Sequence, residues 1–363
     1  MRVGVTSSAA AFDFPSASFS GRSAAANMDR LLGSSRYRVV ASLDEGGMGE
    51  IYELAHVGLG RRCVLKVLRA SYAERHDLAA RLENEARVLA ALSSRGTPTL
   101  FDMGHLADGR PYLVMERISG SDLSKARNAM ELDAAVETVI ALLETLSEVH
   151  EAGYVHRDVK LDNVIVTEDG RVVLIDFGIA RRHDDELRIT RQGLTLGSPR
   201  SMAPERHSER GGDERSDLYA VGLLLYELLA GAGPFDDLMG DVRALRAAHA
   251  FRLPKPLAER SVFVPSRVEA VLQRALAKDP ADRFSSAREM VSALSASLSM
   301  EAEDPTEFDP QGLFDDEDSL GFVWEGYERP LTEALQTCQG TGPHSAAAKR
   351  HQSAMMRGSI PAH

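Results

Sequence analysis

Apolar and polar residues alternate in short runs along the first third of the chain, a pattern typical of β-strands. Three such runs, at residues 37–43, 50–57 and 61–69, follow one another with short connections and predict an antiparallel meander. Residues 73–92 instead place their apolar side chains at helical spacing. Two further strand-like runs flank the turn-forming residues 107–110. This part of the chain therefore predicts a five-stranded sheet with one helix.

The middle of the chain is mainly helical. Residues 132–153 form a long apolar-patterned segment that ends at Gly153, and residues 163–176 read as a short hairpin. Residues 216–231 are apolar almost all round, which is typical of a helix inside a large domain. Helical patterns continue to Leu298. The order of elements predicts an α+β protein in which a small sheet domain precedes a larger helical one.

Both ends of the chain lack such periodicity. Residues 1–34 are rich in Ser and Ala and are expected to form a disordered arm, with Met28 as a second candidate start of translation. Residues 299–363 are expected to be an acidic, disordered tail. Within it, residues 301–330 carry eleven acidic side chains and one basic one, a net charge of -10 out of -12 for the whole chain. The remainder has no basic surplus, so nucleic-acid binding is not expected.

Composition excludes several other classes of protein. Cys63 and Cys338 have no partner at disulfide or zinc-site spacing, which favours a reducing, cytoplasmic location. No apolar run reaches the roughly 20 residues that a membrane-spanning helix needs, so no membrane span is expected. The N-terminus carries Asp13 and several serines rather than the apolar core of a secretory signal.

Candidate chemistry is concentrated between the predicted helix and hairpin. The segment YVHRDVKLDNVIV places Asp158, Lys160 and Asn163 on one loop, and Asp176 follows at the end of the next strand. Asn163 and Asp176 supply the oxygen ligands that Mg²⁺ takes alongside phosphate oxygens. Asp158 is then available to accept a hydroxyl proton or to orient the attacking group. Lys160 is placed to neutralise charge on a transferring phosphoryl group.

These motifs resemble those of the protein kinases. His156-Arg157-Asp158 with Asn163 matches the catalytic loop, Asp176-Phe177-Gly178 the magnesium-binding motif, and Ala203-Pro204-Glu205 the end of the activation segment. The lysine in HRDVK is similar to that of the Ser/Thr branch. GGMG followed by an apolar residue and Tyr resembles the bacterial Ser/Thr kinases in particular. The resemblance covers residues 37–298 in order, and a chance match to one motif would not place the others.

The resemblance implies a two-lobed kinase fold, with an N-lobe at about 35–117 and a C-lobe at about 118–298. It implies ATP and Mg²⁺ as cofactors. Lys66 is the lysine that holds the nucleotide phosphates, and Glu85 is favoured over Glu83 as its ion-pair partner from helical phase and family wording. Asp217 is implied to brace the catalytic loop and Arg283 to pair with Glu205. The catalytic candidates are Asp158, Lys160, Lys66, Glu85, Asn163 and Asp176, of which the last two are the metal ligands.

The resemblance also identifies a nucleotide-binding surface. Met115 is the implied gatekeeper, and residues 116–118 the adenine-binding hinge. The implied nucleotide-binding residues are Leu43, Gly46, Gly47, Met48, Gly49, Ile51, Val64, Lys66, Glu116 and Ile118. Asp44 replaces the first glycine of the family's G-x-G-x-x-G loop, whereas the two glycines that let the backbone approach phosphates remain. We expect ATP binding to survive, and Asp44→Gly to tighten it or leave it unchanged.

Two segments are candidates for regulation. The activation segment offers Thr190 and Thr195 for autophosphorylation, with the phosphate docking on Arg157, while Ser198 is expected to line the active site. Unmodified loop hydroxyls are the alternative. In the tail, aromatic side chains lie among carboxylates. Such a segment is usually a solvated, disordered tail, and docking onto a partner or back onto the kinase domain is the alternative that this interleaving raises. The tail aromatics are Phe308, Phe314, Phe322, Trp324 and Tyr327.

Together these features predict an ATP-dependent serine/threonine kinase that acts on proteins, including itself. Two alternatives differ in class. A pseudokinase would signal by shape through its tail, and Asp44 and Val64, at a position where the family has a smaller residue, are the departures that favour it. A small-molecule phosphotransferase would use the same lobes. It is disfavoured because a free metabolite needs no activation segment.

Overall fold

The structure is a computed structural model, and it describes residues 19–45, 49–126, 130–182, 197–207 and 212–298. Internal contacts divide the chain into two units, residues 1–301 and 302–363, so all the described residues belong to the first. Among them, no helix combines the length and the apolar content that crossing a membrane requires.

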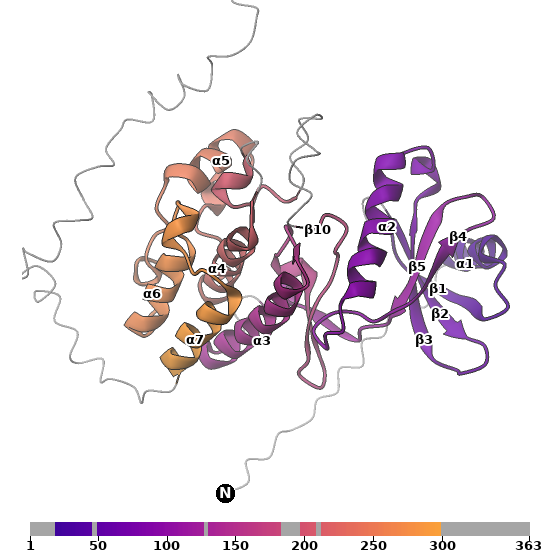
Figure 1. The fold of residues 1–363 in the computed structure, drawn as a ribbon, viewed down its shortest axis with the longest axis horizontal. Coiled ribbons are helices and arrows are strands. Elements are labelled where there is room, and N and C mark those ends of the chain that lie inside the picture. Colours follow the sequence, from indigo (N-terminus) through magenta and orange to yellow (C-terminus); the bar gives the residue numbers. More distant parts are fainter. Residues whose placement is uncertain (1–18, 46–48, 127–129, 183–196, 208–211, 299–363) are drawn as a thin grey trace, which may run out of the picture. The chain divides into compact units, whose positions relative to one another are not determined.

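The N-terminal part forms the predicted five-stranded antiparallel sheet, with strand order β1-β2-β3-β5-β4 (Figure 1). The meander and the later hairpin both lie where the hydrophobic alternation indicated. The strands are β1 (Tyr37–Glu45), β2 (Gly49–His56), β3 (Arg62–Leu68), β4 (Leu100–His105) and β5 (Pro111–Glu116). Register shifts occur between Val39 and Ala41 and between Ser42 and Asp44, so β1 is irregular as it approaches the glycine-rich turn.

The two faces of this sheet are covered by different helices because side chains alternate along each strand. Cys63, Leu65 and Val67 of β3 are buried with residues of α1 (Phe19–Leu32). Val64, one residue out of phase, packs instead in a cluster with residues of α2 (His76–Ala91). In Figure 1, α2 lies on the side of the sheet that faces the C-terminal helices. Lys66 shares the phase of Val64, so the alternation turns it towards α2.

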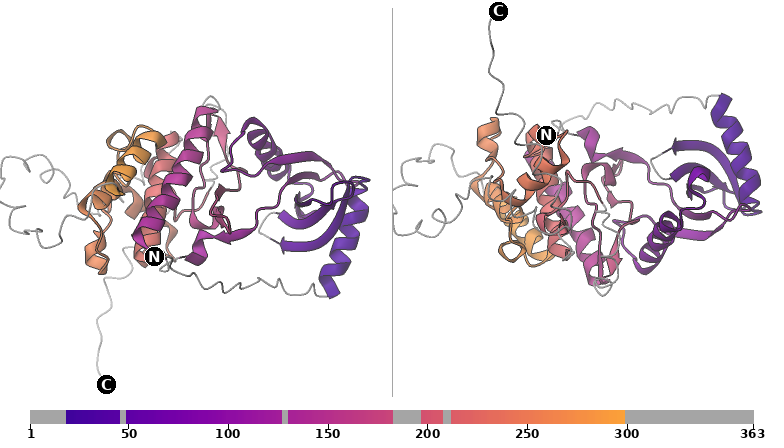
Figure 2. Two further views of the ribbon diagram at one scale, coloured as in Figure 1. Left: turned by 90° about the horizontal axis from the view of Figure 1, so that it is seen from below. Right: turned by 90° about the horizontal axis from the view of Figure 1, so that it is seen from above.

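Helix α1 corrects the prediction of a disordered arm for residues 19–32. Met28 and Leu32 are buried against the sheet, and the Asp29 carboxylate accepts a hydrogen bond from the Val39 backbone N–H at 2.8 Å. Both views of Figure 2 show α1 along the side of the sheet farthest from the C-terminal helices. An Ala-rich helix of 14 residues is marginal in water, so its stability comes from this packing, which the sequence pattern did not indicate. Residues 1–18 lie outside the described part.

The C-terminal part is mainly helical, as predicted. Its helices are α3 (Leu132–Glu151), α4 (Glu214–Ala230), α5 (Val242–Phe251), α6 (Ser266–Ala275) and α7 (Ala287–Leu298). Two small sheets lie beside them: β6 (Gly120–Asp122) with β8 (Val164–Thr167) and β9 (Val172–Leu174), and β7 (Tyr154–Val155) with β10 (Arg181–Arg182). The predicted hairpin is β8 with β9, whereas β6, β7 and β10 are too short to be read from periodicity.

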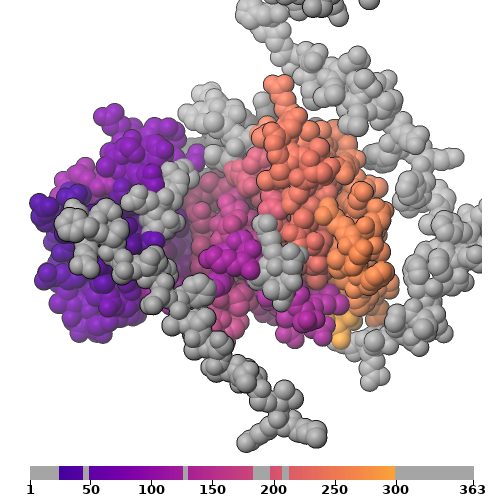
Figure 3. Space-filling model, turned by 180° about the vertical axis from the view of Figure 1, so that it is seen from behind, coloured from indigo at the N-terminus to yellow at the C-terminus, as the bar shows by residue number. Residues whose placement is uncertain are grey.

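The largest apolar core is built around α3 and α4. Helix α4 is buried on every side, in agreement with its apolar sequence. The Asp213 side chain caps its first turn by accepting a hydrogen bond from Arg215 N–H, and Gly231 ends it with φ of 73°. On the face shown in Figure 3, the surface of the sheet domain (indigo to purple) adjoins that of the helical domain (magenta to yellow). The candidate chemistry is divided between the two domains: Lys66 lies on β3 of the sheet domain, whereas Asp158, Asn163 and Asp176 lie next to β7, β8 and β9 of the helical domain.

Candidate active site

Lys66, Glu85 and Asp176 form a charged cluster between the sheet and the helical domain. The Lys66 ammonium donates to both oxygens of Glu85, at 2.9 Å to Oε1 and 2.7 Å to Oε2, and to Asp176 Oδ1 at 3.1 Å. The side chain of Glu85 is 3% exposed, so this carboxylate is buried and neutralised by Lys66. The cluster joins β3, α2 and the segment after β9.

Glu85, and not Glu83, is the ion-pair partner of Lys66, because the two glutamates lie on different faces of α2. Glu83 lies two residues earlier on α2, and its side chain is 37% exposed and near Arg87 and His105. Glu85 falls on the face of α2 that packs against the sheet, which is where the alternation of β3 also turns Lys66. The structure therefore brings together the pair that the sequence favoured.

The electrostatics of the cluster favour a charged lysine between two carboxylates. Burial opposes the positive charge of Lys66, but Glu85 and Asp176 outweigh burial and raise its pKa. The charge of Lys66 lowers the pKa of Asp176 against the opposing effect of burial. Burial raises the pKa of Glu85, but both of its oxygens accept from Lys66, an arrangement that favours the ionised form. The cluster is thus a fixed ammonium beside two carboxylates, suited to holding polyphosphate and metal ions.

Asp158 is held in a fixed position by its neighbours on the catalytic loop. Its Oδ2 accepts from the Lys160 ammonium at 2.9 Å and from the Asn163 amide at 3.0 Å, and its Oδ1 accepts from the Ser198 backbone N–H at 3.2 Å. Lys160 and Asn163 come from the same loop, whereas Ser198 comes from the end of the activation segment. A carboxylate with three donors and little exposure has a defined orientation towards the cleft.

The side chain of Asp217 on α4 holds the backbone of this loop through hydrogen bonds. Its two carboxylate oxygens accept from the backbone N–H groups of His156 and Arg157, each at 2.8 Å, and it also lies 2.9 Å from His150 Nε2. Arg157 has φ of 72°, a conformation that a non-glycine residue adopts only when its surroundings impose it. Asp217 therefore fixes the strained turn that precedes Asp158, the role implied for it by the family resemblance.

The turn after β9 also contains a non-glycine residue with positive φ that its surroundings hold in place. Asp176 adopts φ of 67°, and the Phe177 side chain that follows is completely buried in the large core with Val88 and Leu89 of α2. The Asn84 amide donates to the Ala180 carbonyl at 2.7 Å, which ties α2 to the same turn. The position of Asp176 is thus set jointly by the core and by α2.

Asn163 and Asp176 fit the binding of a divalent cation. The Ile175 backbone N–H donates to the Asn163 carbonyl at 2.9 Å, so the two segments run side by side. The Asn163 NH₂ group donates to the Asp158 carbonyl at 2.8 Å and to its carboxylate, and these acceptors require the nitrogen to face them. The amide oxygen is left as an acceptor. Among the described residues, no three or more His, Cys, Asp or Glu side chains are grouped so that they could hold a metal ion. Asn163 and Asp176 offer oxygen atoms of the kind that Mg²⁺ takes together with phosphate oxygens and water.

A cleft of about 300 Å³ joins these groups. Its lining includes Lys66, Asp158 and Asp176 together with Gly49 of β2 and Ser198. This volume lies in the range of small-molecule sites. A side chain at Gly49 would approach the Val67 carbonyl at 3.2 Å, so the β2 backbone runs close to β3 here. The cleft therefore places the Lys66 ammonium, the Asp158 carboxylate and Asp176 around one space, while Asn163 lies behind Asp158, to which its amide donates.

The other described residues that were expected to bind nucleotide lie in strands β1, β2, β3 and β5 and in the segment after β5 that leads to the helical domain. Leu43 lies in β1 at the second register shift, between Ser42 and Asp44, and Val64 pairs with Met115 across β3 and β5. The Glu116 carboxylate accepts from the Thr99 backbone N–H at 3.2 Å and from the Arg171 guanidinium at 2.8 Å, which holds the connection to the β8–β9 hairpin. Ile51 and Ile118 are both half-buried. The remaining expected residues, Gly46, Gly47 and Met48, lie outside the described part.

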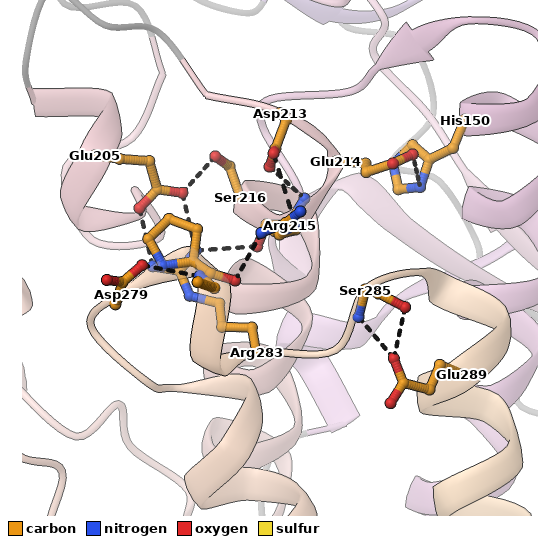
Figure 4. Close-up of polar contacts among 12 residues, drawn as sticks. His150, Glu205, Asp213, Glu214, Arg215, Ser216, Asp279, Arg283, Ser285 and Glu289 are labelled. Atoms are coloured by element: carbon orange, nitrogen blue, oxygen red, sulfur yellow. Dashed lines mark hydrogen bonds and ion pairs between the residues drawn. The ribbon is translucent and has the colours of Figure 1, made fainter.

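The end of the activation segment is anchored by an ion pair that the family resemblance implied. Arg283 donates to Glu205, at 2.8 Å from Nη1 to Oε1 and 2.9 Å from Nη2 to Oε2, and the Ser216 hydroxyl also donates to Oε1 at 2.6 Å (Figure 4). Arg283 is fully buried. Of the candidate phosphorylation sites, Thr190 and Thr195 lie outside the described residues, whereas Ser198 contacts Asp158.

Sequence reasoning missed several supporting residues. Nothing in the spacing of Asn84, Thr99, His150 or Arg171 identifies them, because each acts across a tertiary contact. Arg206 is a further example, since its Nη1 donates to the Arg157 carbonyl. Only its place beside the motif APE could have drawn notice to it.

Comparisons with known proteins all point to one family. The family model described as "Protein kinase domain" matches residues 37–294. Serine/threonine-protein kinase Pkn1 of Myxococcus xanthus is 37% identical over 267 residues, which cover 72% of this chain and 38% of Pkn1. PknL of Mycobacterium tuberculosis is 36% identical over 274 residues, covering 74% of this chain and 67% of PknL. The crystal structure of the Mycobacterium tuberculosis PknI kinase domain matches with a TM-score of 0.57 at 30% identity, over 72% of this chain and 96% of that domain. The chain spans half or less of the length of Pkn1 and of pkn3, another Myxococcus xanthus kinase.

Proposed function

The chain belongs to the protein kinase family, and we propose that it transfers the γ-phosphoryl group of ATP to serine or threonine hydroxyls of proteins. The setting of Asp158 carries the proposal. Its carboxylate faces the cleft between the Lys160 ammonium and the Ser198 backbone N–H, at 2.9 and 3.2 Å. There it can orient an acceptor hydroxyl and take its proton, while Lys160 offsets the negative charge that develops beside it.

Lys66, Glu85 and Asp176 would position the phosphates of the nucleotide for the transfer. Glu85 holds the Lys66 ammonium at the cleft, where it can bind the phosphates of a nucleotide. Asn163 and Asp176 would hold Mg²⁺, which would neutralise charge on the phosphate oxygens. The residues of the chain thereby bring the phosphoryl donor and the acceptor hydroxyl together, and positioning of this kind accounts for much of a kinase's rate enhancement.

Substitution of Asp158 tests the proposal. Purified wild-type protein with Mg²⁺ and labelled ATP is expected to label Ser or Thr of itself and of a generic acceptor protein. Asp158→Asn should lower the rate by about a hundredfold or more while nucleotide binding, followed by calorimetry, remains. The matched control is Asp169→Asn in the exposed β8–β9 turn, which should keep full activity. If wild type binds ATP but labels nothing, the protein is a pseudokinase.

We further propose that a phosphate on Thr190 or Thr195 activates the protein by binding to arginines beside the catalytic loop. Three of them gather there. Arg206 donates to the Arg157 carbonyl, and β10, which contains Arg181, pairs with β7 just before the loop. Burial lowers the pKa of Arg206, and the nearby charge of Arg181 acts in the same direction. A phosphoryl group would bring about -1.5 to -2 charge to this basic cluster.

Autophosphorylation is tested on wild-type protein after incubation with Mg-ATP. Mass spectrometry should find phosphate on Thr190 or Thr195, and phosphatase treatment should lower activity. Changing the modified threonine to alanine should reproduce the loss. The control is Ser292→Ala, which removes an exposed hydroxyl of α7 far along the chain from the catalytic loop and should keep full activity. Full activity of a protein that carries no activation-segment phosphate would contradict the proposal.

We also propose that the acidic tail recruits a partner protein with a basic surface. The support is its sequence, because aromatic side chains interleaved with carboxylates offer both apolar anchors and charge. Deleting residues 301–363 should abolish capture of that partner at low salt while leaving the intrinsic kinase rate intact. Unchanged partner capture, activity and stability after the deletion would contradict a docking role for the tail.

A further inference from the structure

Arg200 forms a tightly paired cluster with two acidic residues of the helical domain. Its Nη2 lies 2.7 Å from Glu227 Oε1 and 2.6 Å from Asp236 Oδ2, and its Nε donates to Asp236 Oδ1 at 2.9 Å. The guanidinium thus contacts both oxygens of Asp236 and one of Glu227. We call these three residues the Arg200 cluster. Its geometry is that of a site that binds a planar guanidinium.

Glu227, the member of the cluster that lies on α4, is poorly placed for the stability of that helix alone. Glu227 lies in the last turn of that helix, where the helix dipole disfavours a negative charge, and its side chain is only 11% exposed. Hydrogen bonding to Asp236 and the charges of both carboxylates raise the pKa of Arg200. The arginine therefore offsets an unfavourable pair of carboxylates, and its removal would leave both without this cation.

The cluster lies next to the position of the acceptor hydroxyl. A small cavity of about 40 Å³ is lined by the catalytic-loop segment 159–162, by Ser198, Arg200 and Ser201, and by α4 residues that include Glu227. Lys160 and Ser198 line both this cavity and the larger cleft that holds Asp158. A peptide whose hydroxyl reaches Asp158 would therefore have the Arg200 cluster beside it, because the two cavities share Lys160 and Ser198.

The charge of this surface depends on Arg200. Exposed Asp162 also lines the cavity, so Asp162, Glu227 and Asp236 carry three negative charges against the single positive charge of Arg200. The Lys160 charge is matched by Asp158. Because Arg200 pairs with Glu227 and Asp236, a substrate cation that reaches these two carboxylates meets charges that are already paired, and Asp162 is the one carboxylate of the three that Arg200 does not contact. Without Arg200 the same surface would be a ready site for a substrate arginine or lysine.

Resting on the proposed protein kinase activity, we propose that Arg200 is a specificity-determining residue that masks an acidic subsite beside the acceptor. In the wild-type protein, the Arg200 cluster makes the enzyme indifferent to basic residues flanking the phosphorylated hydroxyl. Replacing the arginine with a neutral residue converts the surface into one that selects Arg or Lys. Arg200 does not line the cleft that contains Lys66, Asp158 and Asp176, so it acts by controlling the charge available to the substrate.

The experiment compares peptides that differ only by one arginine. A neutral serine peptide is paired with variants in which one arginine replaces each flanking position in turn, and kcat/KM is measured for every peptide. Wild type should treat the neutral and basic peptides alike, within about twofold. Arg200→Gln should prefer an arginine at one or more positions by about tenfold, the effect of one charge-assisted hydrogen bond. The double variant Arg200→Gln/Glu227→Gln should lose most of that preference.

Two controls separate this effect from damage to the fold. Arg243→Gln removes an exposed arginine of α5 and should leave all peptide ratios at the wild-type values. Arg200→Lys keeps the positive charge but lacks the fork that spans both acids, so its ratios should be intermediate. Each ratio compares peptides within one variant and is therefore insensitive to a lower fraction of folded enzyme. If Arg200→Gln does not fold, Arg200→Lys still tests the proposal. Basic-to-neutral peptide ratios of kcat/KM for Arg200→Lys that equal those of wild type would overturn it.

The outcomes distinguish this inference from the proposed function. If wild type phosphorylates no peptide or protein, the kinase proposal fails. If wild type is active and Arg200→Gln is folded and active with unchanged ratios, the masking role of Arg200 is wrong while the kinase activity stands. A strong preference of wild type for arginine beside the acceptor would overturn the masking role equally.

Discussion

Glu205 and Arg283 are 78 residues apart in the sequence and form a buried, two-armed ion pair, with both arms between 2.8 and 2.9 Å. Arg283 is inaccessible to solvent and also donates to the backbone carbonyl of Ala277 at 2.8 Å. The pair ties the end of the activation segment to the loop before α7. A buried pair whose remaining hydrogen-bonding groups are satisfied is costly to break, because each partner is left as an uncompensated charge.

Replacing Arg283 by methionine should therefore destabilise the protein strongly. We expect Arg283→Met to lower the free energy of unfolding by about 3 kcal/mol or more, since Glu205 would remain buried without its partner. Denaturant unfolding followed by circular dichroism measures the change. The matched control is Arg288→Met, whose arginine pairs with Glu151 on the surface with an exposed fraction of 75%. That variant should cost less than about 1 kcal/mol, and equal losses in the two variants would contradict the argument.

The same pair predicts a dependence of stability on pH. Burial disfavours the Glu205 carboxylate, but the hydrogen bonds and charge of Arg283 outweigh burial and hold its pKa below the ordinary value of 4.5. A lowered pKa in the folded state means that the stabilisation is complete above pH 4.5 and is lost as the pH falls through the folded-state pKa. The difference in unfolding free energy between wild type and Glu205→Gln should therefore be constant near neutrality and shrink below pH 4.5. A difference that grows on acidification would contradict the sign.

The Lys66–Glu85 pair should behave as a unit in catalysis. Lys66→Met and Glu85→Gln are each expected to lower kcat/KM by about a hundredfold, because either change leaves the ammonium absent or misplaced. The kcat/KM of the double variant should be little lower than that of either single variant, because each single change already abolishes the function of the Lys66–Glu85 pair. Steady-state kinetics with varied ATP gives kcat/KM for wild type, the two single variants and the double variant, which together form a double-mutant cycle. Glu83→Gln is the control and should retain wild-type activity; additive losses in the cycle would show that the two residues act independently.

Helix α1 should contribute to the stability of the sheet domain. Met28 is 2% exposed and packs with Leu32 against the sheet, so Met28→Ala should lower the unfolding free energy by about 2 to 4 kcal/mol. Asn27→Ala changes the neighbouring exposed residue and should stay within about 0.5 kcal/mol of wild type. Thermal and denaturant unfolding of the full chain measure both. Equal stability of Met28→Ala and wild type would mean that α1 does not hold the sheet in solution.

Much of this protein could be predicted from the sequence because the informative signals are local. Strand alternation, helical spacing and the order of short motifs depend only on neighbouring residues. They predicted the five-stranded sheet, the buried helix α4 and the loop that carries Asp158 and Asn163. These signals fail where an element is stabilised by distant parts of the chain. Helix α1 was missed because its Ser- and Ala-rich sequence has a narrow apolar face that is stable only against the sheet.

The sequence by itself determined which chemical groups are present and in what order, since side-chain type and motif spacing are written along the chain. Only the tertiary structure decided which of them meet. It brought Glu85 to Lys66 and Asp217 to the backbone of His156, two contacts that helical phase and the family resemblance had favoured, and it joined Arg200 to Glu227 and Asp236, which nothing in the sequence indicated. The physical reason is that an ion pair acts over a few ångströms, whereas these partners are 19 to 61 residues apart and are brought together by the packing of whole elements.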